Sequence, residues 1–543
     1  MRRIRTLATR LVAALLLAAP AGLSAQSYDI VIRNGRVLDG MGNPWIRADI
    51  AIKGGKIAAI GLITAKGARE IDAAGKYVTP GWIDMMDQSG SVLLRNGLAE
   101  NKVLQGVTTA IGGEGGFPVS ASEIPKYFQT LETQGISINF GSYYSQTQAR
   151  TPVLGGSTRR APTAAEMIRI RASIDSAMRA GAMGMTTALI YPPSSYTTTP
   201  ELIESAKALA PYGGTYASHI RGEGAELLEA IGEAIEIGEK AGVPVEIFHL
   251  KAAYQPGWGT LMQGAYELIE AARARGVDVA ADQYPYTAGG TGLEATIPSW
   301  AFEGGRDSLR ARLTNPQIRA RLKNELKTGS PGWWNIIEAA GSWDGVVLTA
   351  ARSQEYEKYQ GKSISAIAKE LGKDPADVAW DMVLAGQGRV MAVYHMMSEE
   401  DVKTALRFPW VSIGSDAGAS LSLGATEAAG LAHPRGYGTH PRIIAKYVRD
   451  DKVLTLPDAI RKMTSWPATR MKLPNRGSLV VGNWADVVIF DYDKIQDMAT
   501  WEEPTRLPTG IDYVLVNGQI AAEGGKHTGV RSGMVLYGPG KAP

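Results

Sequence analysis

Two histidines and an aspartate stand where strongly apolar runs of the sequence end. The chain has only six histidines, so their placement is informative, and His219, His249 and Asp416 each close such a run. Two imidazoles and a carboxylate brought together suit a zinc ion that keeps one position open for water. Taken alone, each could be no more than a polar residue that ends a strand. Their shared placement favours a hydrolytic metal site.

The middle of the chain has the pattern that would bring such residues together. Apolar runs alternate with segments of helical period, which indicates parallel strands buried on both faces and joined by helices. So many units favour an α/β fold of the (β/α)8 TIM-barrel type, in which the C-terminal strand ends form the active site. The candidate strands cover residues 78–84, 108–112, 136–141, 184–190, 215–219, 245–249, 277–284, 390–395 and 411–416. Nine candidates compete for eight places, so one of them must lie elsewhere.

Both ends of the chain differ from the middle. Short alternating or β-branched runs are separated there by turn signals such as Gly54-Gly55 and Asn517-Gly518, as in hairpins. We therefore predict a small β-sandwich domain built from residues 26–79 and 467–543, joined to a barrel at 80–466. The stretch from about 293 to 388 is too long for an ordinary loop and predicts an inserted, largely helical subdomain.

The first 25 residues have the order of a cleavable secretory signal. Four arginines precede the apolar run 11–19, and the small residue Ala25 stands at the end. The apolar run is too short for a stable membrane anchor, so we expect a secreted or periplasmic protein cleaved near Ala25. An amphipathic helix of the folded protein is the alternative. Because the segment carries four arginines and no acid, its removal changes the formal net charge from +3 to −1. That charge gives no reason to expect a nucleic-acid partner.

The absence of cysteine narrows the chemistry further. With none in 543 residues, disulfides, thiolate zinc sites, iron–sulfur clusters and a cysteine nucleophile are all excluded. The sequence also lacks a Gly-x-Ser-x-Gly nucleophile elbow, and no phosphate-binding fingerprint stands between a strand and a helix. A metal site built from histidine and carboxylate remains the best candidate.

Several short motifs, spread in order along nearly all of the chain after residue 25, are shared with a known enzyme family. They are Val78-Thr79-Pro80-Gly81-Trp82-Ile83-Asp84, Gly106-Val107-Thr108-Thr109, Ser218-His219-Ile220-Arg221, His249-Leu250-Lys251, Asp282-Gln283-Tyr284-Pro285-Tyr286, Gly414-Ser415-Asp416 and His433-Pro434-Arg435. With them the sequence resembles the amidohydrolase superfamily and, more narrowly, the N-acyl-D-amino-acid deacylase (D-aminoacylase) family. The resemblance implies a barrel with a small β-sandwich and zinc-dependent hydrolysis of the linear amide bond of an N-acyl amino acid. N-acyl-D-amino acids are one expected substrate class.

The sequence departs from this family on its first barrel strand. The superfamily carries His-x-His shortly after Ile83-Asp84, and this chain has Met86 and Gln88 in those places. A thioether and a neutral amide are poor zinc ligands. One of two metal positions is therefore expected to be lost, which predicts one zinc ion per chain.

A second departure concerns a cysteine that the deacylase family uses as a zinc ligand after its second strand. Gly115 faces that position here, and Glu114 stands beside it in a glycine-rich turn. We predict that Glu114 completes the zinc site with His219 and His249. In the alternative, Glu114 only orients a neighbouring group. Asp87 is a weaker substitute ligand.

The resemblance also implies how the reaction and the substrate are handled. Asp416 would take the proton of the attacking water and return it to the leaving amine. Arg221 and Lys251 stand two residues beyond the paired histidines, and either could bind the free carboxylate of an acylated amino acid or short peptide. An ion pair with a neighbouring acid such as Glu223 is the alternative for each.

Three tyrosines resemble positions that line the substrate pocket of the family. They are Tyr191, Tyr284 and Tyr286, and for each of them simple packing is the alternative. Two further functions stay open at this point: a peptide or cyclic-amide hydrolase on the same fold, and an inactive binding protein that has lost the His-x-His pair. Retention of His219, His249 and Asp416 favours an enzyme. The oligomeric state is open, a homo-oligomer included.

Overall fold

The computed structural model describes residues 28–386, 389–421 and 433–541. The predicted signal segment, residues 1–25, lies outside the described residues. No helix within the described part of the chain is both long and apolar enough to span a membrane.

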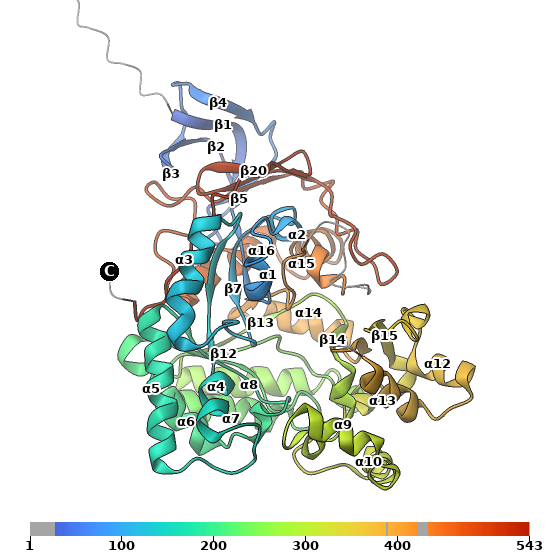
Figure 1. The fold of residues 1–543 in the computed structure, drawn as a ribbon. Coiled ribbons are helices and arrows are strands. Elements are labelled where there is room, and N and C mark those ends of the chain that lie inside the picture. The colour runs from blue at the N-terminus through green and yellow to red at the C-terminus, as the bar shows by residue number, and fades with distance from the viewer. Residues whose placement is uncertain (1–27, 387–388, 422–432, 542–543) are drawn as a thin grey trace, which may run out of the picture.

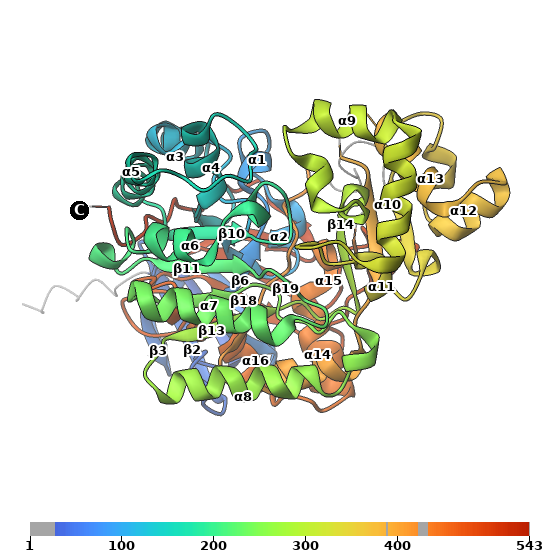
Figure 2. The same ribbon diagram turned by 90° about the horizontal axis from the view of Figure 1, so that it is seen from below.

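Eight parallel strands form a barrel at the centre of the molecule (Figures 1 and 2). In order they are β6 (Trp82–Asp87), β7 (Val107–Gly112), β8 (Asn139–Ser142) continued by β9 (Tyr144–Ser145), β10 (Gly184–Ala188), β11 (Thr215–His219), β12 (Val245–Ile247), β13 (Val279–Gln283) and β17 (Val411–Ile413). A parallel bridge between Asp87 and Ala417 closes the ring. The predicted TIM-type barrel is confirmed.

The apolar character of these strands explains why they form a barrel. Every residue of β6, β7, β11, β12 and β13 is buried, as expected for strands covered on one face by helices and on the other by the barrel interior. The helices around them are α3 (Ile124–Gln134), α4 (Gln146–Leu154), α5 (Ala164–Ala180), α6 (Thr199–Ala206), α7 (Leu227–Ala241), α8 (Leu261–Ala274), α14 (Glu399–Arg407), α15 (Arg435–Arg442), α16 (Leu456–Met463) and α17 (Ser465–Arg470). Two short helices, α1 (Gly90–Leu93) and α2 (Glu100–Val103), lie between β6 and β7.

A separate group of elements is inserted between β13 and β17. It contains α9 (Arg306–Thr314), α10 (Pro316–Thr328), α11 (Ile336–Ala339), α12 (Ile364–Leu371) and α13 (Pro375–Ala385), drawn at the lower right of Figure 1. Its antiparallel sheet has the order β14 (Ala288–Gly292), β16 (Met391–His395), β15 (Val346–Ala350). The ninth candidate strand, 390–395, therefore belongs to this sheet. An apolar run that ends in histidine looks the same in either sheet, so its pattern alone could not assign it.

The two chain ends meet in a nine-stranded sheet at the top of Figure 1. Its strands are β21 (Lys526–His527), β20 (Gln519–Glu523), β19 (Ile511–Val516), β18 (Val487–Phe490), β5 (Tyr77–Pro80), β1 (Tyr28–Val37), β2 (Ile46–Lys53) and β3 (Lys56–Gly61), with β4 (Gly67–Asp72) beside β1. The sheet has a hydrophobic core of its own, which includes Ile50, Val487 and Leu515. The limits 26–79, 80–466 and 467–543 and the inserted stretch near 293–388 stay predictions of domain boundaries.

Candidate metal centre

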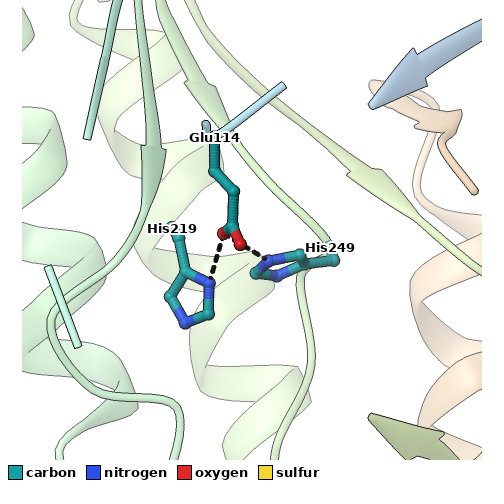
Figure 3. A group of neighbouring side chains, drawn as sticks. All are labelled: Glu114, His219 and His249. Carbon is teal, nitrogen blue, oxygen red and sulfur yellow. Dashed lines mark hydrogen bonds and ion pairs between the residues drawn. The ribbon is translucent and has the colours of Figure 1, made fainter. Parts of the chain in front are cut away.

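Glu114, His219 and His249 come together at one end of the barrel (Figure 3). One ligand atom from each lies within 4.8 Å of the others. Glu114 Oε2 lies 2.7 Å from His219 Nδ1 and 3.6 Å from His249 Nε2. Both histidines are buried, and the glutamate side chain is 19% exposed. The structure therefore assembles the three residues that the sequence predicts as ligands.

The backbone around each strand end sets the direction of these side chains. His219 is the last residue of β11, and His249 follows β12 in the left-handed region with φ 37°. Glu114 follows β7 in a glycine turn. Gly116 in that turn has φ 64°, and a Cβ atom there would lie 2.8 Å from the backbone nitrogen of Ser145. Only glycine permits such a close approach, so the turn holds Glu114 over the barrel mouth.

The charges of the three groups depend on one another. Burial alone would raise the pKa of Glu114, but the two neighbouring imidazoles hold that pKa well below its usual value. Burial and the Lys251 ammonium lower the pKa of His249, whereas Glu223 and Glu114 raise it, and the balance brings it to about 9. The carboxylates of Glu223 and Glu114 thus favour an added proton on the imidazole of His249 when no metal is present. A metal ion would take the place of that proton.

The space among these side chains suits a single ion. A void of about 20 Å³ is bounded by Glu114, His219 and His249, among other residues, and this is enough for one or two water-sized occupants. The donor set of two imidazole nitrogens and one carboxylate is typical of hydrolytic zinc sites that leave a position open for water. The residues present therefore fit zinc.

A larger cavity adjoins the triad. It has a volume of about 720 Å³, and its lining includes Glu114, Tyr191, Asp416 and Arg435. The same four residues also line the smaller void. A substrate in the larger cavity would therefore reach both the triad and Asp416.

Asp416 is held in place from several sides. It follows β17 with φ 49°, and its backbone N–H donates to the carbonyl oxygen of Met86 at 2.9 Å. One carboxylate oxygen lies 2.8 Å from Arg435 Nη1, and the other accepts a hydrogen bond from Gln88 Nε2 at 3.3 Å. The carboxylate is 13% exposed, which leaves it accessible from the cavity.

The first barrel strand offers no ligand to the triad. Met86 is fully buried in an apolar cluster. The carboxylates of Asp84 and Asp87 each lie 2.8 Å from the buried ammonium of Lys102, which also donates to Ser415 Oγ at 2.9 Å. Asp87, predicted as a weaker substitute ligand, thus forms an ion pair with Lys102.

Lys251 and Arg221, the two residues predicted to bind the substrate carboxylate, lie in different surroundings. Lys251 lines the small void with the triad, and its Nζ pairs with Glu223. Arg221 points elsewhere, because the chain turns after β11. Its guanidinium binds Glu233 through two hydrogen bonds of 2.8 Å and donates to the carbonyl oxygen of Thr197. The ion pair considered as its alternative role is the arrangement found, with Glu233 as the partner.

The three tyrosines predicted to line the pocket also lie in different surroundings. Tyr191 lines the cavity, with its ring centroid 5.1 Å from that of His219. Tyr284 lines the small void, 6.3 Å from the ring of His249. Tyr286 lines neither space, and its ring lies 5.6 Å from that of His433, as in its alternative of simple packing.

Sequence reasoning assigned no role at the site to Arg435, to Gln88 or, beyond an ion pair, to Glu223. The signal for Arg435 was present, because the residue ends one of the shared motifs. Glu223 lies four residues after His219, yet only the turn after β11 brings its carboxylate back to both histidines. No local pattern indicated the contact between Gln88 and Asp416, which are 328 residues apart.

Comparisons with known proteins show which family and which solved structures the chain is similar to. Residues 361–522 match the model of the Amidohydrolase family. A D-aminoacylase of Alcaligenes xylosoxydans xylosoxydans is 34% identical over 534 residues, which is 94% of this chain and 98% of that protein.

Solved structures are similar over the same extent. An N-acyl-D-glutamate deacylase of Bordetella bronchiseptica, in complex with zinc and a phosphonate inhibitor, aligns with a TM-score of 0.78 and 29% identity. A D-aminoacylase with a binuclear metal centre, described by one-metal activation and second-metal attenuation, aligns with a TM-score of 0.77 and 30% identity. Each alignment covers 94% of this chain and 100% of the other.

Proposed function

We propose that this chain, which belongs to the N-acyl-D-amino-acid deacylase (D-aminoacylase) family of amidohydrolases, hydrolyses the amide bond of N-acyl-D-amino acids with a single zinc ion. The family makes it a metal-dependent amide hydrolase. The observation that carries the proposal is the triad of Glu114, His219 and His249 beside a cavity that Asp416 also lines. An inactive binding protein would have no need to keep all four groups at one place.

In this proposal the triad holds the metal, and Asp416 moves the proton. Zinc held by these residues would acidify a water molecule and polarise the substrate carbonyl. Asp416 accepts the proton from the attacking water and delivers it to the leaving amine. The contacts from Arg435 and Gln88 keep the two carboxylate oxygens in fixed directions during these transfers.

Arg435 and Lys251 are our candidates for the free carboxylate of the substrate. Arg435 lines both spaces, and its Nε has no hydrogen-bond partner in the described residues. Lys251 lines the small void. A planar guanidinium and an ammonium suit a carboxylate anion, so this pair replaces Arg221 in the substrate role that the sequence analysis considered.

We further propose one zinc ion per chain. On the first strand, Met86 is buried among apolar side chains, and the amide of Gln88 donates to Asp416. The ammonium of Lys102 brings a fixed positive charge between Asp84 and Asp87. A second cation near this strand would lack free ligands, because Lys102 already pairs with both carboxylates.

The predicted export signal leads to a separate proposal. We propose that residues 1–25 direct the chain out of the cytoplasm and are removed near Ala25. N-terminal sequencing of the protein from a periplasmic or culture extract should then begin at Gln26. An N-terminus that still contains Arg2 and Arg3 in the exported fraction would contradict this.

The main proposal is tested by metal analysis together with a substrate panel. We expect one zinc ion per chain, and release of free amine from N-acetyl-D-amino acids but not from their L enantiomers, from dipeptides or from hydantoins. Activity confined to L-dipeptides would refute the D-amino-acid assignment. A full rate after complete metal removal would refute the zinc mechanism.

A further inference from the structure

Glu223 faces both histidines of the triad from the side opposite to Glu114. Its Oε1 lies 3.1 Å from His249 Nδ1 and 3.6 Å from His219 Nε2. Glu114 approaches the other nitrogen of each ring, Nε2 of His249 and Nδ1 of His219. Each imidazole therefore has one nitrogen toward Glu114 and the other toward Glu223.

The surroundings of Glu223 keep its carboxylate where it is. The side chain is 3% exposed, its Oε1 pairs with the ammonium of Lys251, and its backbone carbonyl accepts the N–H of Ala253 at 2.7 Å. The next residue is Gly224, where a Cβ atom would lie 2.3 Å from the indole nitrogen of Trp334. The turn after β11 is thus packed from both sides, and Glu223 has little freedom to leave.

Hydrogen bonding decides which nitrogen of each imidazole is free for a metal. A neutral imidazole carries one proton, and the nitrogen without it is the one that can bind a cation. A carboxylate only accepts hydrogen bonds, so it favours the proton on the nitrogen that faces it. Glu114 and Glu223 therefore compete for the ring protons, and a metal held beside Glu114 would leave Glu223 as the acceptor on the other side. The buried Nε2 of His219 has no hydrogen-bond partner in the described residues, and the nearby Glu223 is an acceptor for its proton.

We propose that Glu223 is a positioning residue that serves both histidines at once. With a metal on His219 Nδ1 and His249 Nε2, the nitrogens beside Glu114, Glu223 would face the remaining protons on His219 Nε2 and His249 Nδ1. This inference depends on the proposed zinc site. Carboxylates that orient metal-binding histidines typically change metal affinity 10–100-fold when they are lost.

The effect of Lys251 has to be distinguished from that of Glu223, because the lysine contacts the same carboxylate. Its ammonium also lies 2.9 Å from His249 Nδ1, and because an ammonium can only donate, it opposes at that nitrogen the proton that Glu223 favours. Replacing Glu223 alone would leave Lys251 buried without its partner, which destabilises a protein whatever the role of the glutamate. A second variant that also removes the lysine charge distinguishes the two effects.

The experiment measures zinc affinity by competition with a chelator of known affinity, alongside the melting temperature of the metal-free protein. The variants are E223Q, the double variant E223Q/K251M, and E233Q as a matched control. Glu233 lies in α7 and is ion-paired with Arg221, and among the described residues no hydrogen bond or ion pair joins it to either histidine.

We expect E223Q to bind zinc about 10–100-fold more weakly than the wild type. The double variant should regain melting temperature but not zinc affinity, and E233Q should keep the wild-type affinity. An unchanged affinity in E223Q, or an affinity restored in the double variant, would overturn the role of Glu223 while leaving the zinc enzyme intact. Absence of zinc binding in the wild type itself would instead remove the proposed function on which the inference depends.

Discussion

Replacement of Lys102 should cause the clearest loss of folding stability. Its side chain is fully buried, and it lies 2.8 Å from Asp84 Oδ2 and from Asp87 Oδ2. At an effective dielectric constant of about 20, each charge pair at this distance attracts by roughly 6 kcal/mol, before several kcal/mol of desolvation per ion are subtracted. K102M removes the cation and leaves two buried carboxylates unpaired. We therefore expect the free energy of unfolding to fall by about 3–5 kcal/mol.

The assay is urea unfolding followed by tryptophan fluorescence, with K240M as the control. Lys240 forms an exposed ion pair with Glu236 one helical turn away, and such pairs contribute only about 0–1 kcal/mol. The triple variant D84N/D87N/K102M should recover much of the loss, because it leaves no buried unpaired charge. If K102M proved as stable as K240M, the reasoning from the buried charge triad would be refuted.

Three other changes test the site and the fold. H219A should abolish both bound zinc and amide hydrolysis, as measured by metal analysis and amine release, and a variant that keeps its metal would contradict the ligand assignment. D416N should retain zinc and lower kcat by about 10²–10⁴-fold, the usual contribution of a proton-transferring group; an unchanged kcat would exclude that role. Burial lowers the pKa of His440 from 6.5 to about 4, so the unfolded chain binds more protons between those values. The folded state should therefore lose roughly 3 kcal/mol as pH falls from 6.5 to 4. In H440F this part of the acid sensitivity, measured by unfolding across that pH range, should disappear; an unchanged slope would show that His440 is not its source.

The barrel and the two histidines of the triad could be predicted because their signals are local, whereas Glu114 was predicted from its place beside the cysteine position of the family that the sequence resembles. An apolar run that ends in His219 or His249 specifies both a buried strand and a polar group at its end. The same kind of run placed residues 390–395 among the candidate barrel strands, because a sequence pattern does not say which sheet a strand joins. Arg221 shows the limit of local geometry, since the turn after β11 sends its side chain to Glu233.

The parts of the site that escaped prediction depend on contacts between distant segments. Asp416 meets Gln88 across the closure of the barrel, and Lys102 joins Asp84 to Ser415, which is 313 residues away from the lysine. Such contacts follow from how β6 and β17 lie side by side. Neither strand carries a pattern that specifies its partner, so the sequence predicted the residues near the site better than their pairings.

His249 and Asp416 have left-handed backbone conformations, which lower the stability of the fold at two positions that the proposed activity needs. Residues other than glycine held in this region cost of the order of 1–3 kcal/mol each, and φ is 37° at His249 and 49° at Asp416. Two backbone hydrogen bonds offset part of this cost. The N–H of His249 donates to Asp282 Oδ1, and the N–H of Asp416 donates to the carbonyl oxygen of Met86. Glycine would relieve the strain and remove the chemistry. Selection for heat resistance alone exerts no pressure to keep His249 and Asp416, so thermostabilisation of this enzyme has to select for turnover at every round.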